Sequence, residues 1–360
     1  MKVTFESGKK KTKFALGNGQ FGKLRVARKT ETNEFIGVKK VKGDDKIEAS
    51  LNEGRIQAKL SYYPHIMPLL DSVDSRGSRD ERVLYQFMPL AGFGNGVFFQ
   101  EKLALLKDQT QREELLIYIA KGLLTGVANM HKKGISHLDI KPHNFVIDRT
   151  GTPWIIDFGC AMELGNSDQL TGGIGDTRYY SPERLAHHRY MWQQVGEEFK
   201  VNEAEKSFSG PAADAWAMGV TLLEIAYNQY PFEQIKQEER LGCWDSSYFK
   251  MMISKIKELK DVNSVSFKGL IKGLLTIDVK ERLKAIEALD WPVFKRATPM
   301  PAEKVAPIFK QLSELSVSQI DGGSQSDNID GNNSSSITQI NYVEIKPKEK
   351  DEHYACQDFL

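Results

Sequence analysis

The feature that most constrains the fold is a change of pattern near Leu103. Before it lie short apolar or alternating runs separated by Gly, Asn and Asp, which is typical of strands joined by tight turns. One helical pattern interrupts them at residues 46–60. After Leu103 come long amphipathic runs such as REELLIYIAKGLLTGVANMHKK. Strands followed by helices predict an α+β chain with two unlike lobes: a small β-rich lobe with one main helix and a larger helical lobe.

Composition excludes some classes of function. The 360 residues carry a formal net charge of +1, so no overall field attracts nucleic acid, and we expect no nucleic-acid partner. No apolar run reaches the roughly 18 residues needed to span a bilayer, so we expect no membrane span. The three cysteines are widely separated and odd in number, which favours a reducing compartment. We therefore expect a cytoplasmic protein, and delivery into a host cell remains open at this point.

The first candidate site is a glycine-rich segment. Gly17, Gly19 and Gly22 lie between two expected strands. Glycines let the backbone approach phosphate oxygens and present N–H donors to them. A strand follows rather than a helix, which disfavours a dinucleotide-binding Rossmann unit. Taken alone, the pattern fits a simple hairpin turn equally well.

A lysine and a glutamate form the second candidate. Lys39 lies in the apolar strand Ile36-Gly37-Val38-Lys39, and Glu53 lies in the helix that follows. The lysine could bind phosphate while the carboxylate orients it. Taken alone, each residue is more often a solvated position than a functional one.

The decisive pattern is His137-Leu-Asp139-Ile-Lys141-Pro-His-Asn144. It places a carboxylate, a cation and an amide oxygen on one tight loop, as a base, a phosphate-neutralising group and a metal ligand would require. Asp157-Phe-Gly follows thirteen residues after Asn144, behind the apolar strand WII. Turn hydrogen bonds alone would not need this combination.

Together these motifs resemble the eukaryotic-type protein kinase superfamily, in the Ser/Thr kinase group with a His-Leu-Asp catalytic loop, over about residues 10–297. Three further segments agree with it: Gly175–Glu183, which ends in Ser181-Pro182-Glu183; Asp214–Gly219; and Asp278–Arg282. The resemblance implies an ATP-dependent protein serine/threonine kinase that acts on protein substrates and uses Mg²⁺, with Mn²⁺ as an alternative.

The resemblance also implies a role for each site residue. Asp139 accepts the substrate proton, Lys141 neutralises the γ-phosphate, and Asn144 and Asp157 hold the metal ion. The implied ATP-binding residues are Leu16, Gly17, Asn18, Gly19, Gln20, Phe21, Gly22, Leu24, Lys39, Glu53, Gln86 and Met88. The last two belong to a hinge at 85–89 whose register the sequence does not fix, and Phe145 is a further candidate against adenine. Thr177 is expected to bridge the base and Lys141, Glu183 to pair with Arg282, and Asp214 to anchor the large lobe.

The chain departs from the family pattern at three places. Leu138 stands where an arginine usually meets a phosphorylated activation loop, so we expect activity without loop phosphorylation. Gln57 occupies a position that is usually apolar. The distance from Glu183 to Asp214 suggests an insertion at about 188–209, which is either a surface loop or a docking element for a partner.

The expected domains are an N-terminal extension at 1–9, a kinase domain at 10–297 (lobes at about 10–88 and 89–297), a helical extension at 298–317 and a tail at 318–360. The tail is rich in Ser, Gly, Asn and Asp, which predicts disorder. It is a second candidate site for a docking partner.

Two other functions fit part of the pattern. A pseudokinase would keep the fold without phosphoryl transfer, and a small-molecule kinase would share the His-x-Asp loop. Lys39, Asp139, Asn144 and Asp157 are all present, which disfavours the first. Ser181-Pro182-Glu183, part of a peptide-substrate platform in the resemblance, disfavours the second.

Overall fold

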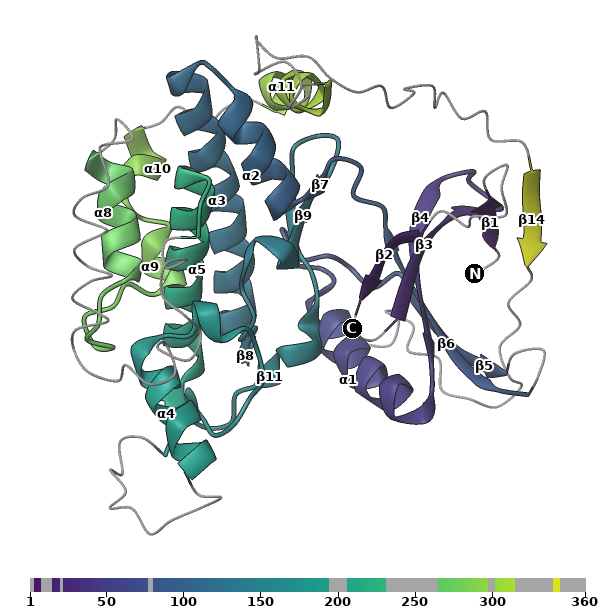
Figure 1. Cartoon of the computed structure of the whole chain (residues 1–360), viewed down its shortest axis with the longest axis horizontal. Coiled ribbons are helices and arrows are strands. Elements are labelled where there is room, and N and C mark those ends of the chain that lie inside the picture. The colour runs from purple at the N-terminus through teal and green to yellow at the C-terminus, as the bar shows by residue number, and fades with distance from the viewer. Residues whose placement is uncertain are drawn as a thin grey trace, which may run out of the picture. The chain divides into compact units, whose positions relative to one another are not determined.

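The structure of the chain is a computed structural model. It describes residues 3–7, 15–19, 22–76, 80–193, 206–230, 265–296, 302–314 and 339–343. The chain divides into two compact units, one of Met1–Tyr62, Met67–Ala91 and Ser316–Leu360, the other of Tyr63–Ile66 and Gly92–Leu315 (Figure 1). The first is built mainly of strands and the second mainly of helices, so the predicted α+β architecture is confirmed.

The strand-rich unit contains one antiparallel sheet. Its strands are β1 (Val3–Ser7), β2 (Ala15–Gly19), β3 (Gly22–Lys29), β4 (Phe35–Lys42), β5 (Asp71–Arg76), β6 (Arg82–Pro89) and β14 (Gln339–Val343). Their order is β14-β1-β3-β4-β6-β5, and β2 also pairs with β3. The register sets Leu24 opposite Lys39, and Lys39 opposite Gln86 on the next strand. Three of the expected ATP-binding residues therefore lie in one row across this sheet.

The helix of this unit, α1 (Asp44–Leu60), packs on the sheet. It follows Gly43, whose φ of 90° is open to glycine but strained for other residues. Asp44 and Asp45 lie in its first turn, where carboxylates stabilise the positive end of the helix. Ile47 packs with Val41 and Leu84 of the sheet, and all three are fully buried. The apolar residues at helical spacing in the sequence therefore lie on the face that this helix buries.

Strand β14 lies inside the segment that the sequence predicts to be disordered. It pairs antiparallel with β1, with Val3 opposite Val343 and Ser7 opposite Gln339. The structure therefore differs from the expectation at these five residues of the tail. The local sequence QINYV accounts for the difference, because its Ile, Tyr and Val favour extended backbone.

The helical unit is built around α5. Its helices are α2 (Gly96–Leu105), α3 (Gln109–Lys132), α4 (Pro182–Gln193), α5 (Gly210–Tyr227), α8 (Val265–Leu274), α9 (Ala285–Ala288), α10 (Pro292–Arg296) and α11 (Ala302–Glu314). Fifteen of the eighteen residues of α5 are buried, as expected of a helix that is apolar on nearly every side. Helices α2, α3 and α8 contact it.

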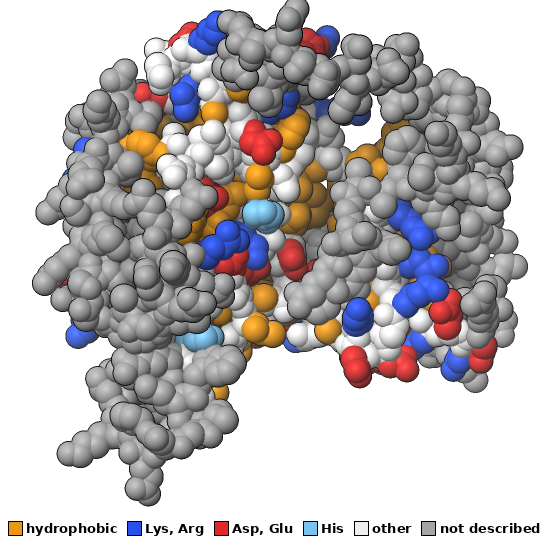
Figure 2. Space-filling view, viewed as in Figure 1, with side chains coloured by type: hydrophobic (Ala, Val, Ile, Leu, Met, Phe, Trp, Pro, Cys, Tyr) orange, Lys and Arg blue, Asp and Glu red, His pale blue; other side chains and the backbone are white. Residues whose placement is uncertain are grey.

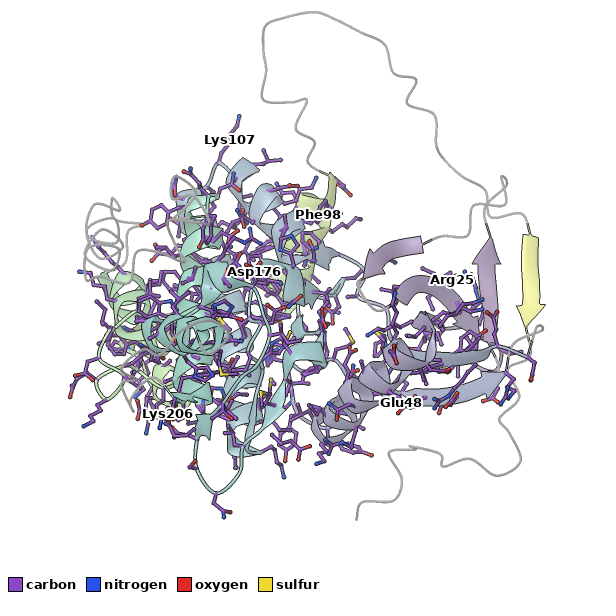
Figure 3. The ribbon with its side chains drawn as sticks, turned by 60° about the horizontal axis from the view of Figure 1, so that its bottom comes forward. Arg25, Glu48, Phe98, Lys107, Asp176 and Lys206 are labelled. Atoms are coloured by element: carbon purple, nitrogen blue, oxygen red, sulfur yellow. The ribbon has the colours of Figure 1, made fainter. Side chains whose placement is uncertain are left out.

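Short strands and single turns carry the loops of this unit. The strands are β7 (Gly94–Asn95), β8 (Ile135–Ser136), β9 (Phe145–Ile147), β10 (Pro153–Ile155), β11 (Met162–Glu163), β12 (Gln169–Leu170) and β13 (Phe208–Ser209). The 3₁₀ turns are η1 (Pro142–Asn144), η2 (Phe158–Cys160) and η3 (Thr177–Tyr179). Strands β7, β9 and β10 form one small sheet, β8 pairs with β11, and β12 pairs with β13. In Figure 3, Asp176, which precedes η3, lies among the side chains of this unit, whereas Lys107 projects outward from the loop between α2 and α3.

Helix α11 lies where the sequence predicts a helical extension. Val305, Phe309 and Leu312 are spaced by four and three residues and are buried, as on one face of a helix. The Phe309 ring packs edge-on against Phe93, with centroids 4.8 Å apart, and stacks on Phe99 of α2 at 5.7 Å. Apolar packing therefore holds α11 against α2.

Candidate active site

A single buried carboxylate anchors the start of the catalytic loop. Asp214 of α5 is fully buried. It accepts hydrogen bonds from the backbone N–H groups of His137 at 2.8 Å and Leu138 at 2.7 Å, and from Nε2 of His131 at 2.9 Å. Burial alone would raise the pKa of Asp214, but the hydrogen bond from His131 and the neighbouring donors hold it below its usual value. The expected anchoring role of Asp214 is thus visible in its contacts.

His137 supports the loop through both of its ring nitrogens. Its Nε2 lies 3.1 Å from the carbonyl oxygen of Ile156, and its Nδ1 accepts the N–H of Asp139 at 3.3 Å. The His137 ring also packs beside Phe158 of the Asp157-Phe-Gly segment, with centroids 5.5 Å apart. This residue therefore joins the two motifs of the site.

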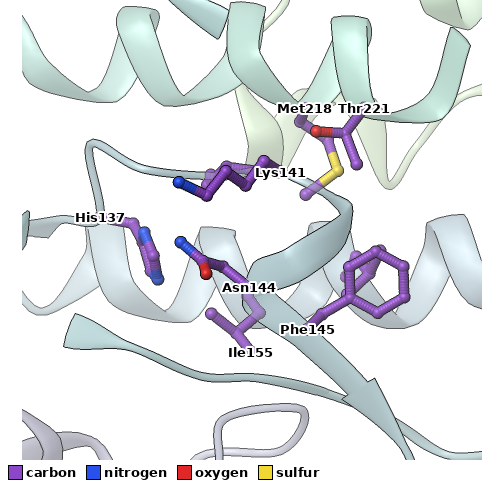
Figure 4. Close-up of a pocket in the computed structure, with 9 residues that line it drawn as sticks. His137, Lys141, Asn144, Phe145, Ile155, Met218 and Thr221 are labelled. Atoms are coloured by element: carbon purple, nitrogen blue, oxygen red, sulfur yellow. The ribbon is translucent and has the colours of Figure 1, made fainter. Parts of the chain in front are cut away.

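The carboxylate of Asp139 is surrounded by three donors. Nζ of Lys141 lies 3.1 Å from Oδ1 and 2.9 Å from Oδ2. Nδ2 of Asn144 donates to Oδ2 at 2.7 Å, and the backbone N–H of Asp176 donates to Oδ1 at 2.9 Å. Charge-assisted hydrogen bonds of this kind fix the orientation of an ionised carboxylate. Figure 4 shows the polar ends of Lys141 and Asn144 pointing in the same direction, beside a small cavity that His137 also lines.

Asp176 occupies the place expected for Thr177. Its carboxylate lies 3.8 Å from Nζ of Lys141, in addition to the backbone contact with Asp139. In the described part of the chain, the Thr177 hydroxyl forms no hydrogen bond to Asp139 or Lys141. Arg178 donates hydrogen bonds to the Asp176 carboxylate from Nε and from Nη2, the latter at 2.6 Å. Burial opposes ionisation of Asp176, but this arginine and Lys141 lower its pKa below the usual value.

Asn144 and Asp157 offer oxygen ligands suited to a divalent cation. Both hydrogen bonds of the Asn144 side chain use Nδ2, toward the Asp139 carbonyl at 2.8 Å and the Asp139 carboxylate, so its Oδ1 remains an acceptor. Asp157 is exposed and has a left-handed φ of 65°, which is uncommon for a residue other than glycine. Two hard oxygen donors fit Mg²⁺, which proteins typically hold with one or two carboxylates together with substrate phosphates. The described residues contain no group of three His, Cys, Asp or Glu side chains placed to hold a metal ion without such help.

In the strand-rich unit, the expected pair of Lys39 and Glu53 is present. Nζ of Lys39 lies 2.5 Å from Oε2 of Glu53, and both side chains are largely buried. Gln57, one turn later on α1, is also buried and donates to the Met67 carbonyl at 2.9 Å. The helix register is therefore the expected one, and a hydrogen bond compensates for the polar residue at a usually apolar position.

The other expected ATP-binding residues are placed in three different ways. The backbone of β2 and β3 includes Leu16, Gly17, Asn18, Gly19, Gly22 and Leu24, whereas Gln20 and Phe21 lie outside the described residues. Leu24 and Met88 flank Gly37, since a Cβ on this glycine would lie 3.5 Å from Leu24 and 3.3 Å from Met88. The side chain of Gln86 is buried, and its Nε2 donates to the Ser50 carbonyl at 2.9 Å, so this amide is satisfied within the protein.

The expected ion pair of Glu183 and Arg282 is present and bidentate. Nη1 lies 2.6 Å from Oε1 and Nη2 lies 2.9 Å from Oε2. The Arg282 side chain is fully buried and also donates to three backbone carbonyls. Such hydrogen bonds compensate for part of the cost of removing the charge from water.

The activation segment, which is the loop at residues 160–180, is held by packing and strand pairing. Leu138, buried with a φ of 63°, forms an apolar cluster with Leu170, Phe208 and Ala213. Strand β12 of this segment pairs with β13, which sets Leu170 opposite Phe208. The predicted insertion at 188–209 therefore ends inside the core, and its middle lies outside the described residues. Figure 2 shows basic and acidic side chains beside a histidine on this face, with hydrophobic side chains around them.

Sequence reasoning missed three residues near the site: Val146, Asp176 and Arg184. Phe145, the candidate against adenine, is buried against Gly96, whereas Val146, the next residue of β9, is partly exposed. The alternation of side chains along a strand could have indicated this. The sequence favours Thr177 over its neighbour Asp176, and no local pattern marks Arg184.

Known proteins resemble this chain along most of its length. The family "Protein kinase domain" matches residues 11–294. The carbon catabolite-derepressing protein kinase of Saccharomyces cerevisiae is 26% identical over 327 residues, covering 88% of this chain and 45% of the yeast protein. The serine/threonine-protein kinase AtPK1/AtPK6 of Arabidopsis thaliana is 28% identical over 275 residues, covering 74% of this chain and 50% of the plant protein. The chain thus spans about half the length of these two relatives.

Proposed function

Because the chain belongs to the protein kinase family, we propose that it transfers the γ-phosphoryl group of ATP to serine or threonine hydroxyls of protein substrates. The observation that supports this most directly is the setting of Asp139. Its carboxylate is oriented by Asn144 and Asp176 and lies next to the ammonium group of Lys141. A base and a cation are thus side by side, as phosphoryl transfer to a hydroxyl requires.

The proposed reaction needs little covalent chemistry from the protein. The oxygen of the substrate hydroxyl attacks the γ-phosphorus, the bond to the β-phosphate oxygen breaks, and ADP leaves. Asp139 accepts the hydroxyl proton, and Lys141 stabilises the negative charge on the transferred group. The three donors around Asp139 keep the carboxylate aimed in one direction, which reduces the reorganisation needed during transfer.

Within each unit, taken by itself, some residues have a proposed role toward the nucleotide. Lys39, held by Glu53, is the proposed cation for the α- and β-phosphates. The backbone of β2 and β3 around Gly17, Gly19 and Gly22 is proposed to cover the phosphates. Asn144 Oδ1 and Asp157 would hold Mg²⁺, which neutralises charge on the phosphates when bound. The described side chain of β9 best placed to contact a base is Val146, and Gln86 would contribute only its backbone.

Preference for serine and threonine over tyrosine rests on Lys141. It lies two residues after the base and close enough to contact it, which suits a short acceptor. The kinase of Arabidopsis named above is called a serine/threonine kinase, which supports the same choice. Phosphorylation of a degenerate peptide library, followed by analysis of the modified residues, tests this point. Mainly phosphotyrosine would refute it.

The decisive experiment compares the purified chain with its Asp157→Ala variant. Transfer from ATP to a peptide library should be lost in the variant, because one oxygen ligand of the metal is removed. Circular dichroism should show both proteins folded, since Asp157 is exposed. Activity of the variant within tenfold of the parent would contradict the site assignment. Turnover by the parent no higher than background would instead favour a pseudokinase, and transfer only to metabolites a small-molecule kinase.

Compartment and partners are further parts of the proposal. No described helix is long and apolar enough to cross a membrane. The few, separated cysteines support a reducing, cytoplasmic setting. Burial raises the pKa of the Cys160 thiol to about 11, so this residue is a poor nucleophile at neutral pH. A docking partner is proposed to bind through the region 188–209 or the C-terminal tail.

A further inference from the structure

Arg184 is a buried arginine between the catalytic loop and the activation segment. It is the third residue of α4, and only 4% of it is exposed. Its Nη1 donates to the carbonyl oxygen of Leu138 at 2.5 Å, and its Nη2 to that of Ile174 at 3.3 Å. Leu138 directly precedes Asp139, and Ile174 belongs to the activation segment. One guanidinium therefore contacts both parts of the site.

The surroundings of this guanidinium are unusual for a buried cation. Among the residues that the structure describes, no carboxylate pairs with it, and its Nε has no hydrogen-bond partner. Two aromatic rings take the place of a counter-ion, with the guanidinium carbon 3.9 Å from the Tyr180 ring centroid and 5.5 Å from that of Phe208. Burial lowers the pKa of Arg184 from its usual value. A buried cation costs stability that an apolar residue would not, so its contacts indicate a role in function.

Arg184 contacts the carbonyl groups of the two segments that determine the position of Asp139. Asp214 fixes the N–H side of Leu138, and Arg184 fixes its carbonyl side, so the peptide groups on both sides of this residue are held. On the activation segment, Ile174 precedes Gly175 and Asp176, and the Asp176 N–H donates to Asp139. A Cβ on Gly175 would lie 2.5 Å from the Leu138 oxygen and 3.1 Å from Nη2 of Arg184. The absence of a side chain there allows this close approach.

We propose that Arg184 is a positioning residue that ties the activation segment to the catalytic loop and so orients Asp139 without a phosphate on the segment. The proposal rests on the proposed function. In this arrangement, the guanidinium that orders the segment comes from α4 instead of position 138. It binds backbone carbonyl oxygens, whereas an arginine at position 138 would bind a phosphate. The arginine geometry matters, since its planar fork reaches two acceptors while its faces stack on rings.

The test uses the full chain, freed of phosphate by a phosphatase and checked by mass spectrometry. The variants are Arg184→Met, Arg184→Lys and, as a matched control, Arg149→Met, whose arginine is exposed in the same unit. We expect Arg184→Met to lower kcat for a peptide by about 100-fold, the loss that a misplacement of about 1 Å can cause. The KM for ATP should change less than threefold. Arg184→Lys should remain within threefold of Arg184→Met, because one ammonium group cannot reproduce the fork.

Hydrogen exchange separates positioning from a purely structural role. In Arg184→Met, amides of 172–178 should exchange faster, while those of α3 and α5 should keep their protection. Unchanged kcat, or equally faster exchange throughout the helical unit, would overturn the proposal. If Arg184→Met fails to fold, Arg184→Lys serves for the same two measurements. A phosphate-free parent that gains activity only after phosphorylation of Thr171 or Thr177 would also overturn it. A parent with no transfer under any of these conditions would refute the proposed function instead.

Discussion

The catalytic loop and the activation segment are held by different kinds of interaction. Backbone amides at the start of the loop converge on the Asp214 carboxylate, which is ionised and fully buried. The middle of the segment is held by the pairing of β12 with β13, by the cluster around Leu138 and by carbonyl contacts of Arg184. The catalytic loop thus depends on the buried Asp214 carboxylate. The activation segment depends instead on apolar packing and on the Arg184 guanidinium, which has no carboxylate partner among the described residues. We therefore expect this segment to be ordered without a phosphate.

The strongest test of this contrast is removal of the charged anchor. Asp214→Ala leaves two buried backbone N–H groups and His131 without their acceptor, at a cost of about 1–3 kcal/mol for each unsatisfied donor. We expect a large loss of unfolding free energy in urea and a loss of kcat of more than about 100-fold, because Asp139 follows these amides directly. Asp214→Asn keeps one acceptor oxygen and should be intermediate. Equal stability of Asp214→Ala and the parent would show that the carboxylate does not anchor the loop.

Removal of an apolar anchor should have a smaller and more local effect. Phe208→Ala removes the ring that packs on Leu170 and faces the Arg184 guanidinium. Truncation of a buried phenylalanine typically costs about 3–5 kcal/mol, part of which here should appear as local loosening of β12 and β13. We expect kcat to fall about tenfold, with faster amide exchange confined to 168–178 and 206–210. The matched control is Ile286→Ala, at an exposed apolar residue of the same unit. Faster exchange that is absent from 168–178 would contradict the packing role.

The two buried anchors Asp214 and Arg184 should also differ in their response to acid. The pKa of Asp214 is lowered in the folded protein, so the unfolded chain takes up the proton first as the pH falls. Its stabilisation is complete above its unfolded pKa of about 4 and is lost as the pH falls through the lower folded pKa. The gap in urea midpoint between the parent and Asp214→Asn should therefore narrow between pH 5 and pH 3. The corresponding gap for Arg184→Met should stay constant over this range, and narrowing of that gap would show that the two anchors are coupled.

The smallest expected effect concerns phosphate itself. Protein freed of phosphate on Ser167, Thr171 and Thr177 should retain activity within about twofold of the untreated protein, because Leu138 offers no cation to a phosphate there. Mass spectrometry before and after treatment, with the same peptide assay, checks this. A silent enzyme that recovers on rephosphorylation would show that the packing contacts alone do not order the segment.

Short sequence motifs predicted most of the residues of the candidate site. The spacing of Asp139, Asn144 and Asp157 predicted residues that the structure brings close to one another, because a tight loop and a following strand fix their positions over short distances. The pairs Lys39 with Glu53 and Glu183 with Arg282 followed from the family resemblance. The contacts of Arg184 were not predictable in this way. Its partners are backbone carbonyls 46 and 10 residues away, which carry no side-chain signature in the sequence.

The strands and helices were also predicted unequally. The periodicity of α1, α3 and α5 marked these helices clearly, because each buries a continuous stripe or nearly its whole surface. Strands β12 and β13 have two residues each and show no alternation, so no period could identify them. Gln86 is a further case, because its place in the hinge is a prediction from the family resemblance. Its side-chain amide is satisfied within the protein by the Ser50 carbonyl, a contact that the sequence does not indicate.

Helix α11 lies beyond the residues that the kinase family matches, yet its packing makes it part of the helical unit. A Cβ on Gly151 would lie 2.2 Å from Val305 and 2.7 Å from Phe309, so this loop and the helix have matching shapes. In evolutionary terms, the piece that can be exchanged or duplicated intact is longer than the family boundary at 294 suggests. A gene fusion joined directly after that boundary would carry an uncovered aromatic patch at Phe93 and Phe99, and selection would act first on its solubility.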